Sequence, residues 1–357
     1  SYMYSFYTPA TGPEEAASAS DVIESGVLST GTVVEEFETE FASFAGVEHA
    51  GAVASGSVAL ELALEASPLS PGDGVVVSTF NCTAVLYALR RCKLAPVFVD
   101  VDPGTLNLAP EQVGTVLEET QGVRGLLLTH TYGLPEDMET LRPLGESNDL
   151  TVINDYCQAP GATVNGTLAS TAGDVGVCSF GATKPMTTGE GGVVTTDNPD
   201  IAAAIREARS NSGVDRAQPP TNVMMSDIEA AIGLTQLKRY PDLLASRRTV
   251  ADTYRAELPS IVAMQCIPDG VTHVYHRFVI RVPDREGLVD SLSAAGVETS
   301  AGITRPLTNF QCVDTPQPRP YPEVTRLLDE YLLLPMHPGL NQSDAERIAA
   351  CVSDYYA

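Results

Sequence analysis

The stretch DVGVCSFGATKPMTTGEGG, residues 174–192, decides how this sequence is interpreted. It begins with a short apolar run that ends at Ser179, continues through a turn of small residues that carries Lys184, and closes with a glycine cluster before a second apolar run at residues 193–196. The pattern predicts a strand, a loop and a strand, and glycines let the loop backbone pass close to a ligand. The chain has only three lysines, so Lys184 in this setting indicates a site; a solvent-exposed loop lysine is the alternative.

Short apolar runs recur along the first part of the chain and predict the strands of one sheet. Segments of helical or loop length separate most of them, and continuous rather than alternating apolar runs are typical of strands covered on both faces. We therefore predict a mainly parallel α/β sheet. Ligands of such sheets bind beyond the carboxyl ends of the strands, so the residues after each run are site candidates. The runs lie at residues 51–54, 75–77, 96–99, 126–128, 151–153, 175–178 and 193–194.

The pattern changes after residue 222. Ser226 and Glu229 have the spacing of a capping box that opens a helix, and Pro241 indicates a break or the start of a further helix. We expect a large domain at residues 1–240 and a smaller C-terminal domain at 241–357. The elements predicted for the smaller domain are a leading helix at 243–258, a strand at 275–282, and helices at 285–295 and 343–352.

Composition excludes several classes of function. The 357 residues are 43% hydrophobic, which supports a substantial core, and 46 acidic against 21 basic residues give a formal charge of −25. This charge disfavours nucleic acid and anionic membranes as partners. No signal peptide and no apolar run of about 18 residues is evident, so we expect a cytoplasmic protein. The seven cysteines are widely spaced and form no CxxC pair, which predicts reduced thiols and no metal site.

Ser55-Gly56-Ser57 stands directly before a predicted helix at residues 58–65. The first backbone N–H groups of a helix have no partners within it, and the helix dipole makes this end positive, so such a turn suits a phosphate group. A serine in this place also acts as an ordinary N-cap, which is the alternative interpretation.

Asp155 follows one of the predicted buried strands, and Gln158 lies three residues further on. A buried carboxylate is unfavourable unless it meets a cationic or donor partner. Facing the ring nitrogen of a pyridine cofactor, Asp155 would keep that nitrogen protonated and make the ring an electron sink, while Gln158 could hydrogen-bond the ring hydroxyl. The alternative is an aspartate that caps the following loop.

Lys184 would join the aldehyde of such a cofactor as a Schiff base and then move protons between the substrate carbon and the cofactor. This chemistry requires the neutral amine, which a partly desolvated pocket with neighbouring cations favours. Ser179 is the predicted phosphate-facing hydroxyl, with a hydrogen bond to the local backbone as the alternative.

Three of these segments together resemble one family. They read SGSVAL at residues 55–60, NDYCQAPGA at 154–162 and SFGATKPMTTGEGG at 179–192. The set resembles the DegT/DnrJ/EryC1/StrS family of fold-type I, pyridoxal-phosphate-dependent aminotransferases, many of which act on nucleotide-linked keto-sugars. The resemblance extends over nearly the whole chain. It implies an α/β, aspartate-aminotransferase-like fold, with a mainly parallel seven-stranded sheet sandwiched by helices and a smaller C-terminal α+β domain.

The resemblance also implies roles for individual residues. Lys184 carries the pyridoxal 5′-phosphate, Asp155 pairs with its ring nitrogen and Gln158 with its ring oxygen. Family members are usually homodimers in which an asparagine reaches the neighbour's phosphate, and Asn222 matches that asparagine; a simple turn residue is the alternative. The residues expected to hold the phosphate within the chain are Gly56, Ser57 and Ser179.

The chain also departs from the family pattern. Cys82 stands where the family usually places an aromatic ring over the cofactor, and a thiol covers less of that ring. Met224 replaces a common arginine. The segments Gly302-Ile303-Thr304 and Pro306-Leu307-Thr308 replace elements that often lie near the sugar, which leaves open an acceptor other than an ordinary nucleotide sugar.

The leading hypothesis is an aminotransferase that moves an amino group from glutamate or glutamine to a keto-sugar, keto-cyclitol or related carbonyl compound. One alternative is a pyridoxal-phosphate enzyme of the sugar dehydratase type, although relatives of that kind replace the lysine by histidine. The other alternative is a non-catalytic regulatory protein of the same fold. Retention of Lys184 weighs against the first alternative, and retention of Lys184, Asp155 and Gln158 together weighs against the second.

Overall fold

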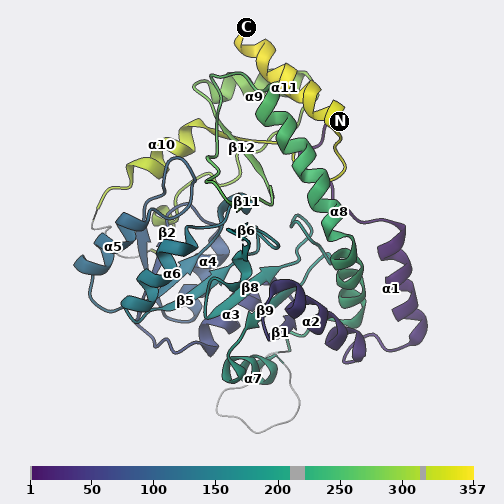
Figure 1. Cartoon of the computed structure of the whole chain (residues 1–357), viewed down its shortest axis with the longest axis vertical. Coiled ribbons are helices and arrows are strands. Elements are labelled where there is room, and N and C mark those ends of the chain that lie inside the picture. The colour runs from purple at the N-terminus through teal and green to yellow at the C-terminus, as the bar shows by residue number, and fades with distance from the viewer. Residues whose placement is uncertain (1, 210–221, 314–318) are drawn as a thin grey trace.

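A seven-stranded sheet runs through the lower part of the molecule (Figure 1). The computed structural model describes residues 2–209, 222–313 and 319–357. Strand β9 runs antiparallel to both of its neighbours, and the other neighbouring strands pair in parallel. The predicted mainly parallel sheet is therefore confirmed. In spatial order the strands are β1 (His49–Val53), β9 (Gly192–Thr196), β8 (Val175–Ser179), β5 (Thr151–Asp155), β4 (Val123–Leu128), β2 (Gly74–Ser78) and β3 (Ala95–Val99).

Helices cover both faces of this sheet, which explains why its strands are apolar without alternation. In β2, Val75 and Val77 belong to the core under one set of helices, whereas Val76 belongs to the core on the opposite face. Successive side chains of a strand point to opposite faces, so a strand buried on both sides needs apolar residues throughout. One set comprises α3 (Gly56–Ala66), α4 (Thr83–Arg91) and α7 (Pro199–Ala208); α5 (Pro110–Glu119) and α6 (Met138–Ser147) lie on the other face.

A third core packs around the loop that carries Lys184. Phe37 and Phe41 from α2 (Thr32–Ala45) contact Phe180 edge-on, with ring centroids 5.4 and 5.2 Å apart. Helix α8 (Asp227–Glu257) adds Ala230 and Tyr240 to the same core. The apolar residues of α2 therefore support the lysine loop directly.

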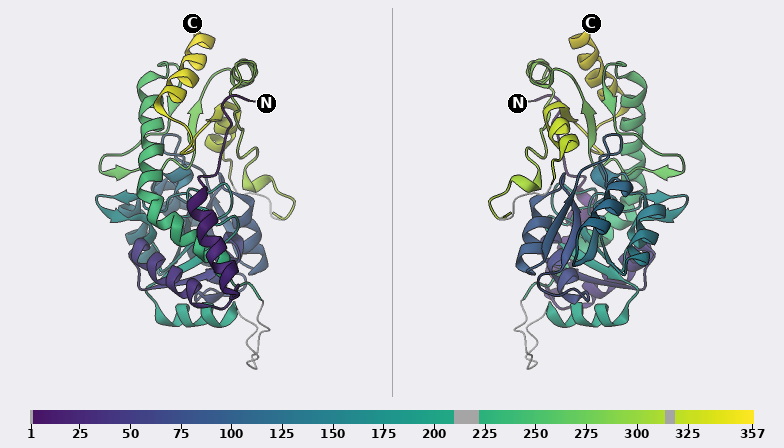
Figure 2. Two further views of the ribbon diagram at one scale, coloured as in Figure 1. Left: turned by 90° about the vertical axis from the view of Figure 1, so that its right-hand side faces the viewer. Right: turned by 90° about the vertical axis from the view of Figure 1, so that its left-hand side faces the viewer.

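Helix α8 is one continuous helix of 31 residues that leaves the sheet and reaches the upper part of the molecule (Figures 1 and 2). Its capping box is confirmed, since Ser226 Oγ accepts from Glu229 N and Glu229 Oε2 accepts from Ser226 N. The expectation of a break or a new helix start at Pro241 is wrong. Proline removes one helical hydrogen bond, but the adjoining turns are anchored in the core, where the Tyr240 hydroxyl donates to Pro160 O at 2.7 Å. The expected division between residues 240 and 241 falls inside this helix and stays a prediction.

The upper part of the molecule is a small antiparallel sheet with helices around it (Figure 2). The strand predicted at 275–282 is shorter, because Tyr275 has a φ of 54°, outside the range of strands. Tyr4, near the start of the chain, pairs with Val297 and packs into the core of this part. The elements are β10 (Ala263–Met264), β12 (Phe278–Arg281), β13 (Tyr331–Leu334), α9 (Arg285–Ala294), α10 (Pro322–Glu330) and α11 (Gln342–Tyr356).

Two further pieces connect the parts. Helix α1 (Pro13–Ser25) lies along α8 (Figure 1). A second small sheet joins β6 (Thr163–Val164) and β7 (Thr167–Leu168) to β11 (Val271–Thr272), so a segment after α8 pairs with one that follows β5.

Gly233 and Gly114 give a matched test of the packing between α8 and α2. A Cβ at Gly233 would lie 2.7 Å from Phe37 Cε2, whereas a Cβ at Gly114 in α5 would meet nothing within 4 Å. We expect Gly233→Ala to destabilise the protein by about 1–3 kcal/mol through overpacking. Gly114→Ala should instead stabilise it by up to about 1 kcal/mol, because alanine favours helix. Denaturant unfolding followed by circular dichroism measures both, and equal shifts for the two variants would contradict this packing.

Candidate functional site

The loop between β8 and β9 is closed by backbone hydrogen bonds. Phe180 N donates to Gly191 O at 2.9 Å, and Thr188 N donates back to Phe180 O at 3.0 Å. Within this closed loop, Lys184 N donates to Gly181 O at 3.0 Å and forms a turn. The glycine-rich sequence therefore builds a compact loop that begins at the carboxyl end of β8 and presents one lysine.

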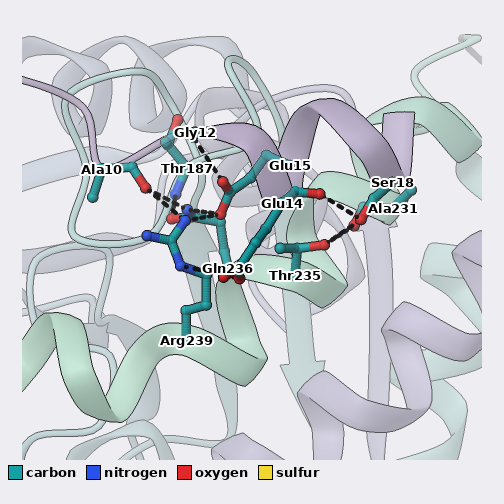
Figure 3. A network of polar contacts seen from close by, with 10 residues as sticks. All are labelled: Ala10, Gly12, Glu14, Glu15, Ser18, Thr187, Ala231, Thr235, Gln236 and Arg239. Atoms are coloured by element: carbon teal, nitrogen blue, oxygen red, sulfur yellow. Dashed lines mark hydrogen bonds and ion pairs between the residues drawn. The ribbon is translucent and has the colours of Figure 1, made fainter. Parts of the chain in front are cut away.

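A polar network on α8 anchors this loop from the side (Figure 3). Gln236 Oε1 accepts from Thr187 N at 3.2 Å, and its Nε2 donates to Ala10 O at 3.0 Å and to Glu15 Oε1 at 2.8 Å. Burial raises the pKa of Glu15, but hydrogen bonds from Gln236 and Arg239 outweigh it and hold that pKa below its ordinary value. One buried amide thus ties the lysine loop to α1 and to the N-terminal segment.

Asp155 and Lys184 lie at the carboxyl ends of the neighbouring parallel strands β5 and β8. Asp155 is 6% exposed, and its Oδ1 accepts from Cys157 N at 3.1 Å. Burial raises the pKa of Asp155, while the hydrogen bond from Cys157 and the charge of Lys184 oppose that rise. The sequence-predicted pair of carboxylate and lysine is therefore brought together.

The pKa of Lys184 does not follow our expectation. Burial lowers it, but charge interactions with Cys157, Cys82 and Asp155 outweigh burial, so the pKa is raised above its ordinary value. The expectation that neighbouring cations favour the neutral amine is wrong for the protein alone. Among these neighbours, Asp155 is the carboxyl group whose negative charge favours the protonated form of Lys184.

The turn before α3 forms a cradle of backbone N–H groups. Ser55 Oγ accepts from Val58 N at 3.3 Å, so Ser55 is an N-cap, and the first helical bond runs from Ala59 N to Ser55 O. The N–H groups of Gly56 and Ser57 precede that bond and face away from the helix. A Cβ at Gly56 would come within 2.4 Å of Ser179 Cβ, so only glycine permits this contact. Gly56, Ser57 and Ser179 therefore meet at one corner of the site.

Cys82 and Gln158 complete the inner wall. Cys82 precedes α4 and is exposed to solvent, yet the surrounding protein and the charge of Asp155 raise the pKa of its thiol. Gln158 Oε1 accepts from Tyr132 N at 3.0 Å, which fixes the amide one turn beyond Asp155.

Asn222 lies in a segment that runs beside the turn before α3. It is exposed, although Val223 beside it accepts from Ala54 N at 2.8 Å, directly before the cradle. The structure therefore places the backbone of this segment along β1, and the expected role of the side chain stays a prediction.

His130, one of the candidates after the predicted strand at residues 126–128 to which no role was assigned, supports the site through Asn154. Its Nδ1 accepts from Glu136 N at 2.9 Å, which leaves Nε2–H to donate to Asn154 Oδ1 at 2.6 Å. Burial lowers the pKa of His130 to about 4, so this neutral form persists. His130 thereby fixes the residue next to Asp155. Its position directly after a predicted strand was the feature of the sequence that pointed to the site.

Tyr7 and Arg277 were missed altogether. The Tyr7 hydroxyl donates to Lys184 O at 2.9 Å, and the Arg277 guanidinium lies over the Tyr7 ring at 4.9 Å. Nothing in the local sequence connects residues so far apart, so only the folded chain could show these contacts.

The described part of the chain contains no cluster of three or more histidine, cysteine or acidic side chains able to hold a metal ion. In the same residues, no helix has both the length and the apolar character needed to cross a membrane.

Comparison with known proteins gives one consistent result. The family model described as the DegT/DnrJ/EryC1/StrS aminotransferase family matches residues 9–353. GDP-perosamine synthase of Caulobacter vibrioides is 32% identical over an alignment of 344 residues that covers 91% of this chain and 91% of its own. The spore coat polysaccharide biosynthesis protein SpsC of Bacillus subtilis is 29% identical and covers 97% of this chain and 95% of its own.

Solved structures agree with this assignment. The structure of S. venezuelae DesV in complex with a ketimine intermediate superposes with a TM-score of 0.91 at 29% identity, covering 96% of this chain and 94% of that one. The aminotransferase TlmJ from Streptoalloteichus hindustanus superposes with a TM-score of 0.93 at 28% identity and covers 99% of both chains. The chain therefore belongs to the DegT/DnrJ/EryC1/StrS aminotransferase family, and its cofactor is pyridoxal phosphate.

Proposed function

We propose that this aminotransferase moves an amino group from glutamate or glutamine to a keto-sugar, keto-cyclitol or related carbonyl compound in a biosynthetic pathway. The observation that carries this proposal is the placement of Lys184 beside Asp155, with the α3 cradle at the same edge of the sheet. Two relatives support a sugar acceptor by their names: GDP-perosamine synthase, and the sugar aminotransferase CalS13 from Micromonospora echinospora, which is 27% identical.

The residues of the site fit pyridoxal phosphate. The cradle at Gly56, Ser57 and Ser179 offers backbone N–H groups, hydroxyls and the positive end of α3 to a phosphate. The bound cofactor supplies an aldehyde and an electron-withdrawing ring. Asp155 would hold the protonated ring nitrogen, and that cationic partner would offset the burial that now raises the pKa of its carboxyl.

Three side chains then control protons and orientation. Lys184 must lose its proton to attach the cofactor, and once released by the substrate amine it moves a proton at the substrate carbon. Gln158 would donate its amide N–H to the ring oxygen, since its carbonyl oxygen is held by Tyr132 N. Cys82 would lie over the ring and cover less of it than an aromatic residue, which leaves more room for an acceptor.

Neither alternative gains support from the relatives. The dehydratase type replaces the lysine that this chain retains, and a regulatory protein has no use for the complete set of Lys184, Asp155 and Gln158. We place the enzyme in the cytoplasm as part of the same proposal.

Replacing Lys184 by alanine tests the proposed role of the lysine. We expect the conversion of the cofactor absorbance by L-glutamate to slow by roughly a thousandfold or more, because both the attachment point and the proton carrier are lost. Lys238→Ala removes an exposed lysine of α8 and should leave the rate unchanged. A Lys184→Ala enzyme that still converts the cofactor at the wild-type rate would show that another group moves the proton.

We further propose a homodimer in which Asn222 of the partner subunit binds the cofactor phosphate. The exposed position of Asn222 in the single chain supports this proposal. Exposed apolar residues near the end of α1, among them Ile23, Val27 and Leu28, offer a surface that a second copy could bury.

Mixed dimers test where Asn222 acts. A Lys184→Ala subunit paired with an Asn222→Ala subunit contains one intact site only if Asn222 reaches the neighbouring site. We expect the mixed dimers to regain about half of the activity per dimer, measured after unfolding and refolding the two inactive variants together. Activity no higher than that of Asn222→Ala alone would place the asparagine in its own subunit's site.

A further inference from the structure

Two buried arginines, Arg247 and Arg277, have no acidic partner among the described residues, and both act by charge on His276, as Lys184 also does. They are 1% and 9% exposed, and the ion pairs in the described part of the chain involve other arginines. Arg247 Nη1 donates hydrogen bonds to the carbonyl oxygens of Tyr275, His276 and Met336 at 3.1–3.4 Å. Arg277 is less satisfied: within the described residues it makes two long bonds, to His276 O and to Thr183 O, both at 3.4 Å.

The Arg277 guanidinium is held next to the lysine loop. Its Nη2 donates to the carbonyl of Thr183, the residue before Lys184. Its face lies 5.0 Å from the Phe6 ring and 4.9 Å from the Tyr7 ring, and Tyr7 in turn donates to Lys184 O. The N-terminal segment therefore holds a positive charge beside the backbone of the lysine loop.

A second buried group beside Arg277 also lacks a partner. His276 is 5% exposed, and within the described residues its Nδ1 has no hydrogen-bond partner. Burial and the charges of Arg277, Lys184 and Arg247 lower the pKa of His276 well below its ordinary value, so the ring is neutral and can present an N–H. A buried polar atom without a partner is uncommon and indicates that a ligand completes the site.

The energetic balance favours an anionic ligand. A guanidinium remains charged at any ordinary pH, and a buried charge without a counter-ion is unfavourable. The two aromatic rings offset only about 0.5–2 kcal/mol each. The planar fork of arginine matches the two oxygens of a carboxylate. In an α-amino acid the carboxylate is attached to the carbon that bears the amine, so a donor whose amine approaches Lys184 brings its carboxylate close to Arg277.

We propose that Arg277, assisted by His276, binds the carboxylate of the amino acid donor and so selects α-amino acids as donors. This assignment rests on the proposed aminotransferase function and names the residue that recognises its donor. Arg277 is then a specificity-determining residue, because the chemistry at Lys184 itself requires only an amine.

Binding to the borohydride-reduced holoenzyme tests the assignment without turnover. In this form the cofactor is fixed on the lysine, so the phosphate cradle is filled and calorimetry reports donor binding alone. We expect Arg277→Gln to weaken L-glutamate binding about 10- to 100-fold, the effect of losing a hydrogen bond to a charged group. The affinity of Arg277→Lys for L-glutamate should lie between those of the wild type and Arg277→Gln, because lysine keeps the positive charge but lacks the planar guanidinium that matches a carboxylate. Arg248→Gln, which removes an exposed arginine next to Arg247, should bind as the wild type does.

Single-turnover measurements on the active enzyme complete the test. For Arg277→Gln we expect the glutamate concentration at half-maximal rate to rise by about tenfold or more, with a smaller change in the limiting rate. The poor donor 4-aminobutanoate, which lacks the α-carboxylate, should react equally with variant and wild type. Equal losses with L-glutamate and L-glutamine would identify the α-carboxylate as the group that is bound.

Two results would contradict the assignment of Arg277. If Arg277→Gln retains its bound cofactor and its melting temperature but binds L-glutamate as tightly as the wild type, Arg277 does not recognise the donor. If none of the amino acids converts the cofactor of the wild type itself, the proposed function fails, and the assignment of Arg277 fails with it.

Discussion

The contact between Gly56 and Ser179 is the constraint on which the site depends. The backbone at the start of α3 lies so close to the end of β8 that a single methyl group at Gly56 would collide with the Ser179 side chain. A similar contact holds Gly192, at the start of β9, against the carbonyl of Ser55. Two glycines therefore bring the positive end of a helix against both ends of the lysine loop, so the proposed phosphate cradle and Lys184 share one edge of the sheet.

The surroundings of the lysine loop keep that arrangement rigid. Phe180 is packed against two phenylalanines of α2 on one side, and the Gln236 amide of α8 holds the loop backbone on the other. The loop is therefore rigid although it is rich in glycine. A rigid loop suits the proposed role of Lys184, which must hold and release a proton at a defined position. The N-terminal segment links this centre to the upper part of the molecule, because Tyr7 bonds the carbonyl of Lys184 and stacks on Arg277. Recognition of the donor and placement of the lysine are therefore coupled through one short segment.

The sequence predicted well what local chemistry determines. The buried strands follow from apolar runs. Asp155, Ser179 and Lys184, which stand directly after or near such runs, lie at one edge of the sheet, as the sequence predicted. The sequence could not show that core contacts near Tyr240 let α8 continue through Pro241, or that a left-handed residue at Tyr275 shortens a strand. Nor could it show the contacts of Tyr7 and Arg277, which depend on segments roughly 180–270 residues apart along the chain, or a pKa for Lys184 set by distant side chains.

The most direct test of the central claim is to reduce the purified holoenzyme with borohydride and map the phosphopyridoxyl group by peptide mass spectrometry. The chain has only three lysines, so the result is unambiguous. The structure predicts the modification on Lys184 alone. A cofactor trapped on Lys93 or Lys238, or none trapped at all in a protein that binds the cofactor, would contradict the account.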